Sequence, residues 1–178
     1  AFLNISTRQS EWDAIVATAQ REPDVWASIG IHPHEAEQHA DLGEGALLEA
    51  AAHPRVIAIG ESGLDYYYDK SDRAVQRDLF RTHIAVSRET GLPLIVHTRD
   101  AEDDTVGILA EEMDKGAFPA LIHCFTASQD FADKVLELGR PGFGPGSGAI
   151  ARSLAQRANV APRRQLPCVQ PRTGTHAQ

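Results

Sequence analysis

Short apolar runs that alternate with segments of helical periodicity constrain the fold of this chain more than any other feature. Four such runs occupy residues 25–31, 56–60, 94–97 and 120–124, and residues 1–5 read as the end of another. Continuous runs rich in Val and Ile are typical of strands that helices cover on both faces. Because amphipathic segments connect the runs, the sequence predicts right-handed β-α-β units and an α/β fold with a parallel sheet.

Three of these runs lead into a side chain of a type that binds metals, namely Glu61, His97 and His123. The carboxyl ends of parallel strands converge on one rim of a sheet, so side chains from different units can meet there. One carboxylate and two imidazoles suit a divalent ion that activates water and polarises a substrate oxygen. The alternative is that each residue merely ends its strand and faces solvent. Three such strand ends together favour a metal site, with these residues as its ligands and catalytic groups.

Three residues near the same strand ends are candidates for substrate binding. His34 belongs to the stretch GIHPH, in which a His-X-His pair can present both imidazoles on one side; a rigid turn at Pro33 fits the stretch equally well. Arg99 follows the third strand end and can meet a phosphate. Asp65 lies in the stretch ESGLDYYY, which directly follows a buried strand.

The tyrosines of that stretch also allow two interpretations. Aromatic rings near a metal can receive bases or sugars. The alternative is a loop that packs against the next helix, and we favour this for Tyr67 and Tyr68. Cys124, within an apolar run, is expected in the core. The remaining histidines in helical or loop contexts are expected at the surface: His39, His53 and His83.

Charge is distributed unevenly along the chain. The formal net charge is −8, yet the last 41 residues hold six Arg and none of the 25 acidic residues. The overall balance argues against a broad basic surface for nucleic acid or membrane, although a metal site can still hold phosphate. Two cysteines indicate a reducing compartment, and no apolar stretch approaches the roughly 18 residues needed to span a bilayer. We expect a cytoplasmic, monomeric protein without membrane contact.

The alternation of predicted strands and helices ends near Gly139. The stretch RPGFGPGSG follows, and the segment after it is rich in Arg, Gln and Pro, with few large apolar side chains. Too little apolar surface remains there to offset the entropy of ordering the chain. The predicted organisation is an α/β domain over residues 1–139 and a disordered, unrelated tail over residues 140–178.

Four motifs together resemble the TatD family of metal-dependent hydrolases. They are GIHPH at 30–34, AIGESGLDYYY at 58–68, PLIVHTRDA at 93–101 and LIHCFTAS at 121–128. The resemblance covers about residues 1–139. It implies a TIM-barrel-like (β/α) fold of the amidohydrolase type, of which this chain holds about five of eight units. It also implies two divalent metal cations (Mg, Mn or Zn) and hydrolysis of phosphodiester bonds in a DNA substrate by metal-activated water.

By position, Glu61 resembles the carboxylate that bridges both metals in the family, and His97 and His123 resemble ligands of the second metal. The family's first His-X-His strand and its final acidic motif have no counterpart here. This predicts a chain truncated at both ends, a tail translated in a shifted reading frame, weak binding of one ion and impaired DNA hydrolysis. Two alternatives stay open: an amidohydrolase-like enzyme acting on an amide or ester bond, and a non-catalytic relative that binds metal or nucleic acid.

Overall fold

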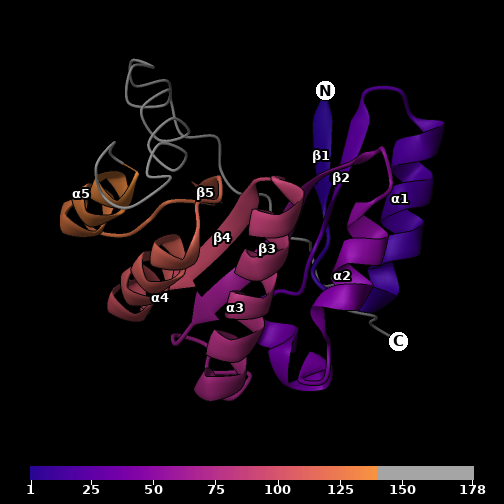
Figure 1. The fold of residues 1–178 in the computed structure, drawn as a ribbon. Helices are drawn as coiled ribbons and strands as arrows, with labels where there is room; N and C mark the ends of the chain where they lie inside the picture. The colour runs from indigo at the N-terminus through magenta and orange to yellow at the C-terminus, as the bar shows by residue number, and fades with distance from the viewer. Residues whose placement is uncertain (140–178) are drawn as a thin grey trace, which may run out of the picture.

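A computed structural model describes residues 1–139 and confirms the predicted α/β fold, with one parallel sheet flanked by helices (Figure 1). The expectation of a disordered, unrelated tail falls on residues 140–178, which lie outside the described residues. The strands are β1 (Phe2–Ile5), β2 (Val25–Ile29), β3 (Val56–Asp65), β4 (Leu94–Arg99) and β5 (Ala120–Ile122). The helices are α1 (Trp12–Arg21), α2 (Glu44–Ala51), α3 (Arg73–Thr90), α4 (Glu102–Lys115) and α5 (Gln129–Leu138), with the 3₁₀ helices η1 (Gln9–Glu11) and η2 (Pro33–His39).

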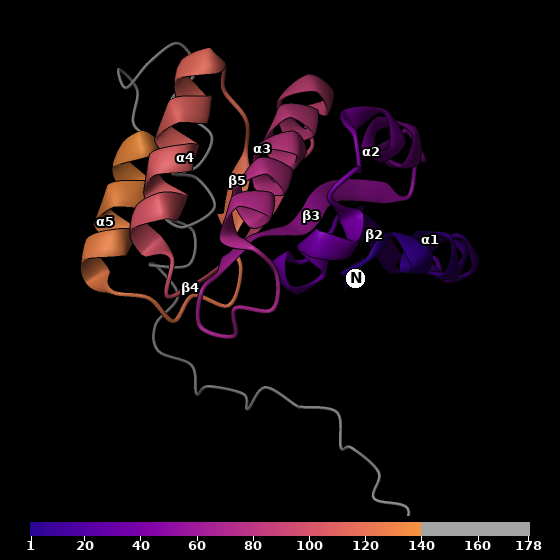
Figure 2. The same ribbon diagram turned by 90° about the horizontal axis from the view of Figure 1, so that it is seen from below.

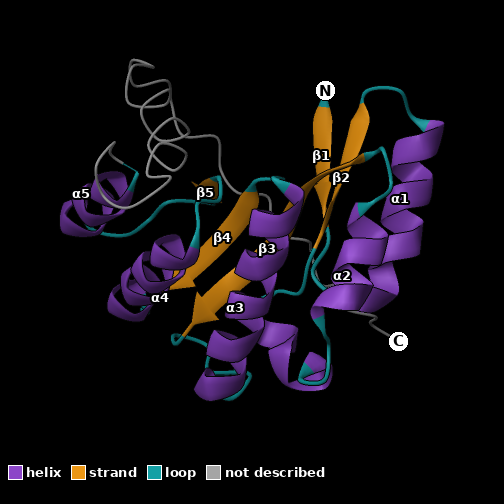
Figure 3. Ribbon diagram, in the orientation of Figure 1, coloured by secondary structure: helices purple, strands orange, loops and turns teal. Residues whose placement is uncertain are grey.

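The strands stand in the sheet in the same order as in the chain, β1-β2-β3-β4-β5, and every pairing is parallel. Seen along the sheet, the five α-helices form an arc on one side of it, whereas the apolar runs indicated helices on both faces (Figure 2). Figure 3 shows how a helix follows each strand and, for β1 to β4, returns the chain to the start of the next strand. Within residues 1–139 the sheet is open, because β1 and β5 each pair on one side only. This is the arrangement of a (β/α) barrel that is not closed, as predicted.

The helix α3 shows how local chemistry sets the length of an element. The carboxylate of Asp72 accepts hydrogen bonds from the backbone N–H groups of Ala74 and Val75, at 2.8 and 3.2 Å, and so caps the start of the helix. At the other end Gly91 has a φ of 70°, a left-handed conformation that glycine adopts without steric cost. Between these ends, Phe80 and Ile84 are fully buried and anchor the helix in the core.

The structure corrects several expectations. Strand β3 continues past residue 60 to Asp65, whereas the sequence placed a loop there. His83 is fully buried, because it lies on the face of α3 that meets the core. Cys124 is exposed, because β5 ends at Ile122 and the chain turns away there. The other two histidines expected at the surface, His39 and His53, are half-buried. Among residues 1–139, no helix combines the length and apolarity that crossing a membrane requires.

Candidate metal centre

The long strand β3 places two carboxylates at the rim of the sheet. It approaches β4 so closely that a Cβ on Gly63 would lie 2.0 Å from the carbonyl oxygen of His97. Glycine therefore lets the strand continue beside β4 where a larger residue would force the two apart. Side chains alternate along a strand, so Glu61 and Asp65, four residues apart, point to the same side. Both carboxylates are buried.

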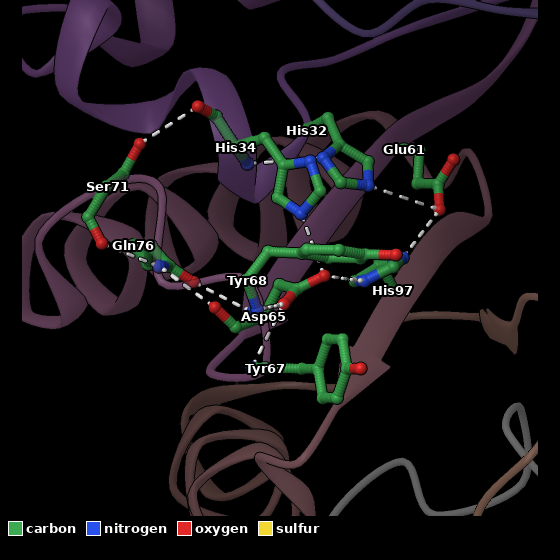
Figure 4. Close-up of polar contacts among 9 residues, drawn as sticks. All are labelled: His32, His34, Glu61, Asp65, Tyr67, Tyr68, Ser71, Gln76 and His97. Carbon is green, nitrogen blue, oxygen red and sulfur yellow. Dashed lines mark hydrogen bonds and ion pairs between the residues drawn. The ribbon is translucent and has the colours of Figure 1, made fainter.

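Both carboxylates contact the same imidazole. His97 Nδ1 lies 3.1 Å from Glu61 Oε1, and His97 Nε2 lies 3.1 Å from Asp65 Oδ2 (Figure 4). With a carboxylate on each side, the ring orientation of His97 is fixed. The strand-end residues Glu61 and His97 thus meet, and Asp65, which the sequence analysis placed among the substrate-binding candidates, joins them.

A third strand contributes His32, which follows β2 and which the sequence analysis did not single out as a ligand. His32 Nε2 lies 4.0 Å from Glu61 Oε1, and the ligand atoms of His32, Glu61 and His97 all lie within 4.8 Å of one another. A transition metal with bonds of about 2.0–2.2 Å holds neighbouring tetrahedral ligands about 3.3–3.6 Å apart. Small side-chain adjustments therefore bring this set of two nitrogens and one oxygen into range of a divalent cation.

The charge states of these groups favour a cation at the same place. Burial lowers the pKa of His32 to about 4, with the neighbouring His97 acting in the same direction, so the His32 ring is neutral at pH 7. Its Nδ1 accepts the N–H of His34, which places the ring proton on Nε2, so a cation bound at Nε2 requires that proton to move to Nδ1. Burial alone would raise the pKa of Glu61, but the hydrogen bond with His97 and the nearby His32 and His123 lower it overall. Burial also opposes the charged form of His97, yet Glu61 and Asp65 raise its pKa above the ordinary value. Two carboxylates thus favour positive charge at the position between them.

Asp65 connects this cluster to the loop that follows β3. Its Oδ2 lies 2.8 Å from His34 Nε2, while its Oδ1 accepts hydrogen bonds from the backbone N–H groups of Tyr67 and Tyr68, at 3.1 and 2.9 Å. Burial would raise the pKa of Asp65, but the N–H of Tyr68 and the two imidazoles lower it. The carboxylate is therefore charged at neutral pH and fixes the loop relative to His97.

The His-P-His stretch is both a turn and a pair of adjacent rings. Pro33 begins η2, and the backbone N–H of His34 donates a 3.1 Å hydrogen bond to His32 Nδ1. The two imidazole rings lie 4.4 Å apart, edge to face. His32 is thereby left with Nε2 directed at Glu61, and His34 with Nε2 directed at Asp65 (Figure 4). The spacing of the motif was the signal that could have identified His32.

The remaining predicted residues, Arg99 and His123, line a cavity beside the cluster. This cavity has a volume of about 390 Å³, and His97 forms part of its wall. His123 follows β5, its backbone N–H donates a 2.8 Å hydrogen bond to the carbonyl of Val96, and its side chain helps to lower the pKa of Glu61. The structure therefore brings the three predicted metal ligands to one rim, while the tight group of ligand atoms contains His32 in place of His123.

The guanidinium of Arg99 is stacked on two tyrosines. Its Cζ lies 3.9 Å from the ring centroid of Tyr67 and 4.7 Å from that of Tyr68. The side chains of Tyr67 and Tyr68 are 56% and 50% exposed, so the prediction that they pack against the next helix is wrong.

The backbone just before His32 is held by a residue that sequence reasoning assigned to the surface. His83 Nε2 accepts a 3.0 Å hydrogen bond from the N–H of Ile31, and its Nδ1 lies 2.7 Å from the carbonyl of Leu79. The first bond requires an acceptor at Nε2, which places the ring proton on Nδ1. The buried ring thus links α3 to the segment that carries His32.

Comparison with known proteins identifies relatives for most of this chain. A protein of Bacillus subtilis (strain 168), "Uncharacterized metal-dependent hydrolase YabD", is 41% identical over 114 residues, which are 64% of this chain and 44% of the relative. A protein of Musicola paradisiaca (strain Ech703), "3'-5' ssDNA/RNA exonuclease TatD", is 36% identical over 115 residues, which are 64% of this chain and 43% of the relative. The chain spans less than half the length of these two relatives.

Solved structures agree with the sequence matches. The crystal structure of YJJV, a TatD homologue from Escherichia coli K12, superposes with a TM-score of 0.69 at 25% identity, over 77% of this chain and 53% of that one. This likeness confirms the expected TIM-barrel-like fold, with a sheet that is not closed over the described residues. The family model described as "TatD related DNase" matches residues 1–166. A match over so much of the sequence shows that this chain belongs to the TatD related DNase family, as its four motifs predicted.

Proposed function

We propose that the cluster at the rim is the metal site of a hydrolase that cleaves phosphodiester bonds in DNA. The observation that carries the proposal is the convergence of His32, Glu61 and His97 next to the cavity lined by Arg99 and His123. A divalent cation bound by these residues supplies a Lewis acid and a water of lowered pKa. An arginine in the adjoining cavity supplies a partner for a phosphate.

The chemistry of the cavity favours an anionic substrate. A formal net charge of −8 argues against a broad basic surface for nucleic acid, so we expect phosphate recognition to be local. Arg99 offers five N–H donors in a planar fork, and His123 adds an imidazole on the same wall. The name of the Musicola relative, an exonuclease for single-stranded DNA and RNA, points in the same direction.

The ligand types favour Mn²⁺ or Zn²⁺ over Mg²⁺, because imidazole nitrogens suit the softer ions and Mg²⁺ prefers oxygen. We propose that Glu61 and His97 are shared by any ion bound here, with His32 or His123 completing its protein ligands. Two ions per complete site, as the family resemblance implies, would need carboxylate and imidazole ligands beyond this cluster. We therefore expect weak binding of one ion and slow cleavage by this chain.

The decisive experiment measures cleavage of a 5'-labelled single-stranded DNA by the purified chain in Mn²⁺, Mg²⁺, Zn²⁺ or EDTA. We expect slow hydrolysis that requires metal. Glu61→Gln keeps the size of the side chain but removes the charge, and should reduce both metal affinity and the cleavage rate by at least about 100-fold. The matched control is Glu49→Gln, which removes an exposed carboxylate on α2 and should change neither.

Three outcomes would contradict the proposal. Cleavage that persists in EDTA, or that survives Glu61→Gln, would place the activity elsewhere. Metal-dependent hydrolysis of amide or carboxylic ester substrates without any cleavage of DNA would favour the amidohydrolase-like alternative. Binding of Mn²⁺ without turnover of any substrate would indicate a non-catalytic relative.

A further inference from the structure

Beside the metal centre lies a surface that the proposed chemistry does not use. We call Tyr67, Tyr68 and Arg99 the tyrosine platform. The two rings are among the few large apolar side chains that the described residues leave exposed. Exposed aromatic rings next to a cavity are uncommon where no ligand uses them, because burying them would stabilise the fold.

The platform is fixed relative to the metal centre by a single carboxylate. Asp65 accepts hydrogen bonds from the N–H groups of both tyrosines through Oδ1, and its Oδ2 lies 3.1 Å from His97 Nε2 (Figure 4). The position of Arg99 is also tied to the metal centre, because Arg99 lies on β4 two residues after His97. The position of the platform is therefore set by the residues that would hold the metal.

The two rings form a corner, and a cation stacks against both of them while part of each ring stays open to solvent. Tyr67 and Tyr68 lie 4.8 Å apart and nearly perpendicular, at 89°, and the ring of Tyr68 lies 5.3 Å from that of His34. The guanidinium of Arg99 stacks on both tyrosines and also faces the cavity. About half of each tyrosine side chain stays open to solvent. A planar, aromatic ligand that carries a negative charge nearby matches these three features.

We infer that the tyrosine platform stacks an unpaired base of the nucleic-acid substrate, next to the phosphate that enters the cavity. The inference rests on the proposed function for the identity of that substrate. A base in the interior of a duplex has both faces covered by its neighbours, whereas every unpaired base can stack on a protein ring. The platform thus selects single-stranded over double-stranded substrate, and Arg99 serves both the base and its phosphate.

Binding measured in EDTA separates this inference from catalysis, because it requires neither metal nor turnover. Fluorescence anisotropy is followed with three labelled probes: a ten-nucleotide single strand, the same strand in a duplex, and a strand of equal length without bases. The full chain should prefer the single strand. Replacing Tyr67 or Tyr68 by Ala should weaken that binding about 10-fold. Binding to the baseless strand, which keeps the phosphates, should not change.

Conservative variants distinguish stacking from a structural role. Tyr67→Phe and Tyr68→Phe keep the ring and should retain the affinity for the single strand. Arg99→Lys keeps the charge but loses the planar group, so its affinity for the single strand should fall in part. Urea unfolding of each variant checks that the fold is intact. Equal loss of affinity for normal and baseless strands, or full affinity in the Ala variants, would overturn the inference. If the chain binds the single strand through the tyrosines yet never cleaves it, the proposed function is wrong and the inference that the tyrosines stack a base is still supported.

Discussion

The buried His83 makes the pH dependence of stability a direct test of the structure. Its ring is fully buried in α3, and both ring nitrogens are engaged, by the N–H of Ile31 and the carbonyl of Leu79. Burial lowers its pKa to about 4, and the hydrogen bond to Leu79 offsets this only in part. The nearby His39 adds a small effect in the same direction as burial.

The sign and size of the effect follow from proton linkage. The ordinary pKa of histidine is 6.5, whereas in the fold it is about 4, so between these values the unfolded chain binds more protons than the folded one. Stability therefore falls as the pH drops through this range. One pKa unit corresponds to about 1.36 kcal/mol, and the full difference to about 3 kcal/mol, of which about 2 kcal/mol is lost between pH 7 and 4.5. That is a large fraction of the 5–15 kcal/mol that typically stabilises a domain.

The assay is urea unfolding followed by circular dichroism at pH 7 and at pH 4.5, in EDTA so that metal binding does not contribute. His83→Gln can still accept the N–H of Ile31 but cannot gain a proton. Whatever constant cost the substitution has, we expect its loss of stability on acidification to be about 2 kcal/mol smaller than that of the unsubstituted chain. His53→Gln, which removes a half-buried histidine elsewhere, serves as the control. Equal pH dependence in His83→Gln and the unsubstituted chain would refute the buried, neutral state of His83.

Further substitutions test the packing around the site and the helices. Gly63→Ala should destabilise the fold by about 3 kcal/mol or more in urea unfolding, because Gly63 has a φ of 143° and the new Cβ would lie 2.0 Å from the carbonyl oxygen of His97. Gly45→Ala, in open space on α2, should instead stabilise it by about 0.5–1 kcal/mol. Glu112→Gln should cost about 2 kcal/mol at pH 7, because the carboxylate of Glu112 is 4% exposed and pairs with Arg88 at 2.7 Å. Added Mn²⁺ should raise the melting temperature of the unsubstituted chain and leave that of Glu61→Gln unchanged.

The strands were predictable because their apolar runs carry the signal of burial, and the runs at 25–31, 94–97 and 120–124 overlap β2, β4 and β5. The length of β3 was not predictable in the same way. Its second half contains glycines and polar residues, which locally favour a loop. They remain in the sheet because β4 approaches closely. Such a contact between distant segments cannot be recognised from the local pattern of apolar and polar residues.

The carboxyl ends of parallel strands share one rim, and Glu61, His97 and His123 all lie at or near such ends. Their placement on one side of the sheet was therefore predictable from the strands alone. The His-X-His spacing could have identified His32 as a candidate, but its distance to Glu61 depends on the turn that begins at Pro33 and becomes visible only in three dimensions. The roles of these residues as ligands stay predictions.

The burial of His83 could have been read from the sequence. It lies four residues after Leu79 and precedes Ile84, so it belongs to the apolar stripe of its helix. The exposure of Cys124 could not, because its position depends on the backbone turning away after Ile122, with a φ of 43° at Cys124 itself.

The order of the strands has a consequence for how the chain can fold during synthesis. Every pairing in the sheet joins strands that are neighbours in the chain, from Phe2 against Val25 to Val96 against Ile122. Among residues 1–139, no strand pairs with one made much later, so each pairing closes over a single β-α unit, which keeps the loop-closure entropy low for a parallel sheet. Each β-α unit that leaves the ribosome can add to a sheet that is already in place. The sheet can therefore grow in one direction, in step with translation.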